Sequence, residues 1–192
     1  FGRLPIPGDE HLCEYLPWLS DPLTRPWEKY TVSLYDWARN ERRRSDRHAD
    51  IARMGAGELP IDDLRTADSE GACEVIENLA GAGNHYHLAV NLPNQGYIAN
   101  LPAGAIVEVP GMMSGVGVLG VGVGPLPEAI AELCRRELTV AQLAVDAAVH
   151  GDRQAALQAL LLDPVVTDLD VASQILDDYL ATYRDYLPRF WG

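Results

Sequence analysis

Apolar side chains recur every three or four residues in several stretches of the chain, which is the period of an amphipathic α-helix. Leu12, Leu16 and Leu19 show this spacing near the N-terminus, where Pro17 breaks or tightens the last turn. The same period predicts helices over residues 34–54, 69–79, 127–136, 140–150, 153–161 and 171–186. The C-terminal third of the chain is therefore expected to be helical.

Between these helical stretches the period changes to two. Residues 85–91 alternate between polar and apolar positions, residues 105–109 follow the same rule, and residues 116–123 form a glycine-interrupted run of β-branched residues. These segments predict a small mixed or antiparallel sheet flanked by helices. The expected fold class is α+β, and residues 1–192 are expected to form a single domain.

Composition narrows the function classes. The net charge is −13 and 47% of the residues are hydrophobic, which is typical of a folded protein that repels nucleic acid and anionic lipid surfaces. Cys13, Cys73 and Cys134 stand far apart without a CxxC pair, which fits a reducing, cytoplasmic setting better than a disulfide framework. The most apolar stretch contains Glu108, prolines and many glycines, so no membrane span is predicted.

A Gly-x-Gly-x-x-Gly pattern occurs at Gly115, Gly117 and Gly120. Such a pattern can hold a dinucleotide pyrophosphate, but only between a strand and a helix that opens at once. Here the glycines alternate with valines and run on to a proline. A glycine-rich hairpin is the favoured interpretation, and a phosphate loop is the alternative.

Two other patterns have a functional and a structural interpretation. His85 and His87 share one face if they lie on a strand, where they could bind a metal, although no third ligand stands near them. The favoured interpretation places them on the polar face of a strand, and a metal site is the alternative. The arginines between Arg39 and Arg53 indicate a solvated helix face or a subunit contact.

Two polar clusters remain. Residues 8–15, Gly-Asp-Glu-His-Leu-Cys-Glu-Tyr, place four ionisable side chains where a loop becomes a helix, which suits either capping or a site. Residues 91–102, Asn-Leu-Pro-Asn-Gln-Gly-Tyr-Ile-Ala-Asn-Leu-Pro, contain three asparagines. Turn chemistry explains the asparagines, and so does a site for sugar hydroxyls.

In order along the chain, these clusters resemble the C-terminal domain of glycoside hydrolase family 4. Further matching segments are Val-Glu-Val-Pro at 107–110, Gly-Pro-Leu-Pro at 124–127, Leu-Leu-Asp-Pro at 161–164 and Tyr-Leu-Pro at 186–188. The α-galactosidase-like branch, with a similar Glu-His-x-x-Glu-Tyr run, is the most similar. The resemblance implies a fold like the C-terminal domain of lactate and malate dehydrogenases.

The resemblance also implies an activity. Family members hydrolyse O-glycosidic bonds by oxidation at C3, elimination, addition of water and reduction, using NAD and a divalent metal, usually Mn²⁺. The family's NAD loop and metal ligands belong to an N-terminal Rossmann half that nothing in this chain matches. The chain is therefore expected to be the substrate and oligomerisation half, inactive alone. The alternative is a non-catalytic sugar-binding or assembly domain that retains the family fold.

Site residues are carried over by position. Asp9 of the Gly8-Asp9 pair aligns best with an aspartate that acts as the C2 base in some members, although a glutamate follows it where the family has threonine. His11 and Glu14 would lie one helical turn apart and contact substrate hydroxyls, and Asn91 and Asn94 would line the other side of the cleft. No cluster suited to phosphate is evident, which favours unphosphorylated sugars. A homo-oligomer is expected by analogy.

Overall fold

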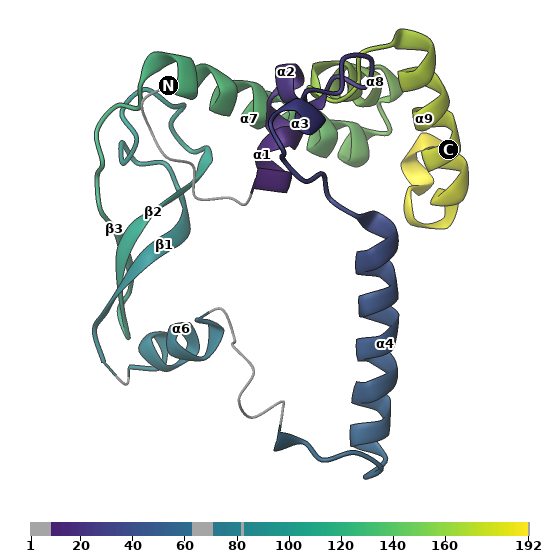
Figure 1. The fold of residues 1–192 in the computed structure, drawn as a ribbon. Helices are drawn as coiled ribbons and strands as arrows, with labels where there is room; N and C mark the ends of the chain where they lie inside the picture. The colour runs from purple at the N-terminus through teal and green to yellow at the C-terminus, as the bar shows by residue number, and fades with distance from the viewer. Residues whose placement is uncertain (1–8, 63–70, 82, 192) are drawn as a thin grey trace. The chain divides into compact units, whose positions relative to one another are not determined.

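The computed structural model describes residues 9–62, 71–81 and 83–191 (Figure 1). Its contacts divide the chain into two compact units, each made of segments distant in sequence. The helical unit comprises Phe1–Leu34, Pro93–Val107 and Gly122–Gly192, and the sheet unit comprises Tyr35–Leu92 and Glu108–Val121. The sequence predicted a single domain over residues 1–192. Each of the two units has its own set of elements.

The helical unit is built around three packed helices, α7, α8 and α9. It contains α1 (Asp9–Tyr15), α2 (Pro17–Ser20), α3 (Pro26–Lys29), α7 (Glu128–His150), α8 (Arg153–Leu162), α9 (Leu169–Thr182), η1 (Arg184–Tyr186) and η2 (Pro188–Phe190). The packed faces of the three long helices carry small residues and leucines: Ala131, Ala147, Ala155, Ala159, Ala172, Leu176 and Leu180 are all buried. Small side chains let helix axes approach closely, and the leucines fill the space between them.

Sequence signals fix the ends of these helices. Asp152 caps α8, because its carboxylate accepts hydrogen bonds from the backbone N–H groups of Gln154 and Ala155 at 2.9 and 3.0 Å. Gly151 ends α7 with φ at 70°. A side chain at Gly151 would also collide with the backbone carbonyl of Arg189. The turn between α7 and α8 therefore requires glycine twice over.

In its described residues, the sheet unit contains most of a three-stranded sheet and the helices α4 and α6. Its elements are α4 (Trp37–Gly55), α6 (Ala72–Leu79), β1 (His85–Pro93), β2 (Ile106–Ser114) and β3 (Gly117–Gly120), with strand order β1-β2-β3. β2 and β3 are antiparallel, with Ser114 opposite Gly117. Val109 and Met113 alternate inward along β2 and are buried.

The α+β class predicted from the sequence is confirmed, as are the three strands and the helices near residues 10, 40, 75 and 155. One prediction was wrong: residues 127–136 and 140–150 are not two helices but the single helix α7. The intervening Glu137, Leu138 and Thr139 include neither glycine nor proline, and Thr139 bonds back to the carbonyl of Arg135 at 2.9 Å. The helix predicted over residues 171–186 is α9, which ends at Thr182. A 3₁₀ turn, η1, follows it.

Within the described ranges, no helix combines the length and the apolar character needed to cross a bilayer.

Candidate active-site segments

The first candidate segment is α1, a short helix held by its apolar side. Cys13 of α1 is 1% exposed, and Leu16, which directly follows the helix, is 7% exposed. Beyond this packing, the Arg136 guanidinium of α7 donates a hydrogen bond of 2.8 Å to the carbonyl of Tyr15, one of the carbonyls that a helix end leaves without an internal partner. α1 is thus fixed to α7 at its C-terminal end.

His11 and Glu14 lie on the exposed side of α1. The Nδ1 atom of His11 lies 3.2 Å from Oε2 of Glu14, and the two side chains are 48% and 42% exposed. The prediction that these residues share one helical face is confirmed. A carboxylate only accepts hydrogen bonds, so this contact requires a proton on Nδ1 of His11. The pair therefore combines an oriented imidazole and a carboxylate, both suited to sugar hydroxyls.

Asp9 is the first residue of α1. Its side chain is outside the described part of the chain, so its role as a base stays a prediction. Asn91 lies on β1 with an exposed side chain and belongs to the sheet unit. No side-chain hydrogen bond to Asn91 is found within the described residues, and its role also stays a prediction.

Asn94 has a different role from the one predicted. Its side chain is 2% exposed, and its Nδ2 donates to the carbonyls of Ile98, Leu101 and Pro102 at 3.0, 3.1 and 3.1 Å. Its Oδ1 accepts from the backbone N–H groups of Gly96 and Ile98 at 3.2 and 3.1 Å. A buried amide with these partners has nothing to offer a sugar, so the substrate contact predicted at Asn94 is corrected. Turn chemistry, the alternative for this segment, explains it.

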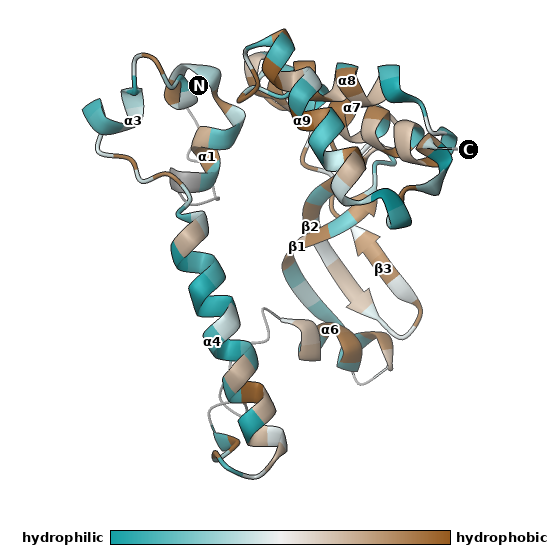
Figure 2. Cartoon of the chain, turned by 90° about the vertical axis from the view of Figure 1, so that its right-hand side faces the viewer, coloured by the Kyte–Doolittle hydropathy of each residue, from teal (hydrophilic) through white to brown (hydrophobic). Residues whose placement is uncertain are grey.

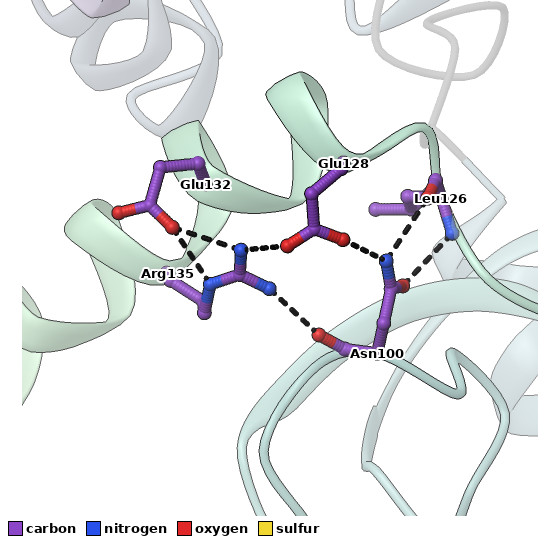
Figure 3. A network of polar contacts seen from close by, with 5 residues as sticks. All are labelled: Asn100, Leu126, Glu128, Glu132 and Arg135. Carbon is purple, nitrogen blue, oxygen red and sulfur yellow. Dashed lines mark hydrogen bonds and ion pairs between the residues drawn. The ribbon is translucent and has the colours of Figure 1, made fainter.

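A polar network joins this loop to the start of α7 (Figure 3). The amide of Asn100 exchanges two hydrogen bonds of 2.9 Å with the backbone of Leu126 and donates to Glu128 at 3.2 Å. Arg135 donates to the carbonyl of Asn100 at 3.0 Å and to Glu132 at 2.9 Å, and forms an ion pair with Glu128. The loop of residues 94–105 is thereby tied to the start of α7 within the helical unit.

The hydrogen bonds and charges in this network shift the pKa values of Glu128 and Arg135. The hydrogen bond from Arg135, followed by the one from Asn100, lowers the pKa of the Glu128 carboxyl below its ordinary value of 4.5. The same hydrogen bond and that of Glu132 raise the pKa of Arg135. Sequence reasoning missed this network, because Asn100 and Arg135 lie far apart in sequence. The only signal was the third asparagine of the 91–102 segment.

The residues that the structure describes do not fit the family's metal or nucleotide. Within the part of the chain that the structure describes, no three His, Cys, Asp or Glu residues gather as a metal site. His87 pairs instead with Asn78 of α6 at 3.0 Å. Gly115 forms the tight turn of the β2–β3 hairpin. The hairpin interpretation of the glycine pattern is confirmed, since no helix opens at these glycines.

Comparison with known proteins gives these segments their context. Residues 1–166 match the model of the "Family 4 glycosyl hydrolase C-terminal domain". The chain belongs to glycoside hydrolase family 4. Among family 4 relatives, the chain is 31% identical over 183 residues to an alpha-galacturonidase of Bacillus subtilis. The aligned region covers 94% of this chain and 39% of that protein. It is 30% identical to an alpha-galactosidase of Rhizobium meliloti, over 99% of this chain and 41% of that protein.

Solved structures support the same family assignment. A Bacillus subtilis structure described as a "putative glucosidase" superposes with a TM-score of 0.79 at 30% identity, over 93% of this chain and 40% of that one. A 6-phospho-alpha-glucosidase from gut microorganisms, in complex with NAD and glucose-6-phosphate, superposes with a TM-score of 0.64 at 28% identity, over 71% of this chain and 31% of that one. The chain thus spans about two fifths of the length of the first three of these family 4 proteins.

Proposed function

We propose that this chain is the substrate side of an NAD- and divalent-metal-dependent glycosidase that hydrolyses O-glycosidic bonds. The family match over residues 1–166 carries this proposal. Family relatives with glycosidase names support it, and family structures in complex with NAD and Mn²⁺ support the cofactors. The residues described here do not fit either group, so we place the NAD and metal sites in a Rossmann half outside this chain.

The chain's own contribution is recognition of the sugar. His11 and Glu14 present one oriented imidazole and one carboxylate on an exposed face of α1, and both groups can bind a diol. Asn91 adds an exposed amide from β1. Arg136 fixes the end of α1, which holds the pair in place. Each contact to a hydroxyl is worth little alone, so several must act together.

Asp9 is our candidate for the base that removes the sugar C2 proton. It begins the helix that carries His11 and Glu14, so the three residues lie within two turns of backbone. A carboxylate near a polar contact set is a common arrangement for general base catalysis. Replacement with asparagine keeps the shape and removes the proton acceptor.

The test is hydrolysis of nitrophenyl galactosides, glucosides and uronides by the full-length protein, with and without NAD and Mn²⁺. We expect activity that needs both additions. His11→Ala and Asn91→Ala should raise KM, whereas Asp9→Asn should lower kcat by a factor of about 10² to 10⁴ while KM changes little. His48→Ala, an exposed histidine of α4, is the control and should leave both constants unchanged.

Several results would contradict the proposal. Turnover without NAD would exclude the proposed chemistry, and unchanged KM and kcat in His11→Ala and Asn91→Ala would exclude these residues as substrate contacts. Absence of cleavage with every glycoside would favour the second candidate, a non-catalytic sugar-binding or assembly domain that retains the family fold.

A further inference from the structure

The C-terminal end of α1 needs a partner from outside the helix. α1 has seven residues and no basic side chain in its last turn, where such a side chain commonly interacts with the carbonyl groups that a helix end leaves unpaired. Leu16 leaves the helix with φ at −120° and ψ at 100°, as expected before Pro17. The backbone N–H groups of Leu19 and Ser20 then donate to the carbonyl of Leu16, at 2.8 and 3.2 Å. The carbonyl of Tyr15 therefore depends on another donor.

That donor is Arg136 of α7, 121 positions further along the chain. Its Nη2 donates to the carbonyl of Tyr15 at 2.8 Å, and its Nε donates to the carboxylate of Glu137 at 3.4 Å. The helices of this bundle carry both apolar and hydrophilic residues (Figure 2), and these two charged side chains are partly buried, at 25% and 33% exposed. A guanidinium bound through two of its nitrogens has a fixed plane. Glu137 therefore holds Arg136 in the orientation in which it reaches α1.

The surroundings of Glu137 make this pairing sensitive to charge. Burial raises the pKa of the Glu137 carboxyl above its ordinary value of 4.5, Arg136 opposes this shift, and the carboxylate of Asp163 at the end of α8 adds to it. Cys134 of α7 is half-buried, and the pKa of its thiol is raised first by burial and then by Glu137. Among these neighbours Arg136 is the cation. The ionised form of Glu137 is therefore stabilised by the same contact that orients Arg136.

We propose that Arg136 and Glu137 are a positioning pair for the sugar-binding face of α1, in which Glu137 orients the guanidinium that holds the end of the helix. This inference rests on the proposed function, because it takes His11 and Glu14 as substrate contacts. Glu14 directly precedes the anchored residue, Tyr15. A helix as short as α1 is marginal without tertiary contacts, and small displacements of a binding group weaken its contacts to a ligand. The effect of the pair thus reaches the sugar through α1.

The first measurement is the KM of the full-length protein for the nitrophenyl glycoside that it cleaves best. Arg136→Ala and Glu137→Gln should each raise KM by about three- to tenfold, and Arg136→Lys, which keeps a charged donor, should recover part of the loss. In the background His11→Ala/Glu14→Gln, which lacks the positioned groups, Glu137→Gln should change KM by less than about twofold. Asp146→Asn removes a carboxylate elsewhere on α7, where it accepts from Gln142, and should leave KM unchanged.

The pH dependence separates orientation by charge from a merely structural role. The ratio of the KM of Glu137→Gln to that of the wild type should fall toward one as the pH is lowered from 7 to 4.5, because the raised pKa leaves Glu137 protonated at the lower value. A protonated carboxyl no longer forms an ion pair with Arg136. Groups that titrate in both proteins cancel in this ratio.

Hydrogen exchange of the α1 amides gives a second readout that needs no turnover. Exchange should be faster in Arg136→Ala and Glu137→Gln than in the wild type, and unchanged in Asp146→Asn. Circular dichroism shows whether each variant is folded, and if Arg136→Ala is not, Glu137→Gln and Arg136→Lys decide the test.

The proposal is overturned if α1 exchanges as slowly in these variants as in the wild type, if their KM is unchanged, or if the KM ratio does not vary with pH. A wild-type protein that cleaves no glycoside contradicts the proposed function instead. Exchange then decides alone: faster exchange of α1 supports the anchoring by the pair, and unchanged exchange overturns it.

Discussion

At the scale of single residues, Asn94 shows how one amide can organise a loop. Its nitrogen bonds three carbonyls and its oxygen accepts from two backbone N–H groups, all within residues 94–102. Gly96, two residues after Asn94, has φ at 92°, which glycine adopts freely. A buried side chain used in this way is structural, and its loss leaves several backbone groups without a partner.

Asn94→Ala should therefore destabilise the protein by about 2–3 kcal/mol, from the desolvation of buried groups left unpaired. The measurement is the free energy of unfolding in urea. Asn91→Ala, an exposed position in the neighbouring strand, is the control and should change this free energy by less than about 0.5 kcal/mol. Equal effects of the two substitutions would show that the Asn94 bonds do not stabilise the loop.

At the scale of secondary structure elements, the start of α7 depends on a network that titrates. Arg135 and Asn100 hold Glu128 in its charged form, so the pKa of Glu128 is lower in the folded chain than in the unfolded one. A lowered folded-state pKa contributes stability above the unfolded value, and this contribution is lost as the pH falls through the folded value. The network therefore weakens below about pH 4.5, the ordinary value of this carboxyl.

Glu128→Gln tests this linkage. The wild type should be more stable than the variant at pH 7, and the difference in the free energy of unfolding should shrink as the pH is lowered below about 4.5. Thermal unfolding followed by circular dichroism between pH 7 and 3 measures it. Salt at 0.5 M should reduce the difference at pH 7, because the carboxylate is exposed. A difference that stays constant over this pH range would contradict the role of the ionised carboxylate.

Periodicity predicted most elements because each is dictated locally. The spacing of apolar residues, Gly151 and Asp152 sufficed for the junction of α7 and α8. The turn at Asn94 was open to two interpretations, since asparagine suits both a turn and a sugar site. The bond between Arg135 and the carbonyl of Asn100 joins residues distant in sequence, and a single sequence contains no information on such pairs.

At the scale of the whole molecule, division into two units limits what one sequence could predict. Both units are made of separate segments, and the hydrophobic pattern of a segment does not identify the segments against which it packs. His11 and Glu14 were predicted as neighbours because helical spacing is local. Asn91 belongs to a different unit, so its relation to the α1 pair depends on the complete assembly rather than on any local rule.

Cofactor binding is also a property of the whole molecule. In a dinucleotide site the glycine loop leads from a strand into a helix whose N-terminus faces the pyrophosphate. In this chain Gly117 has φ at 121° and opens β3 instead, so the pattern has the sequence of such a site without its geometry. The 192-residue chain alone should show no measurable binding of NAD or Mn²⁺ by isothermal titration, whereas the full-length protein should bind both. Binding of NAD to the 192-residue chain at micromolar concentration would show that this half contains nucleotide contacts of its own, and the assignment of that site to a Rossmann half outside the chain would then fail.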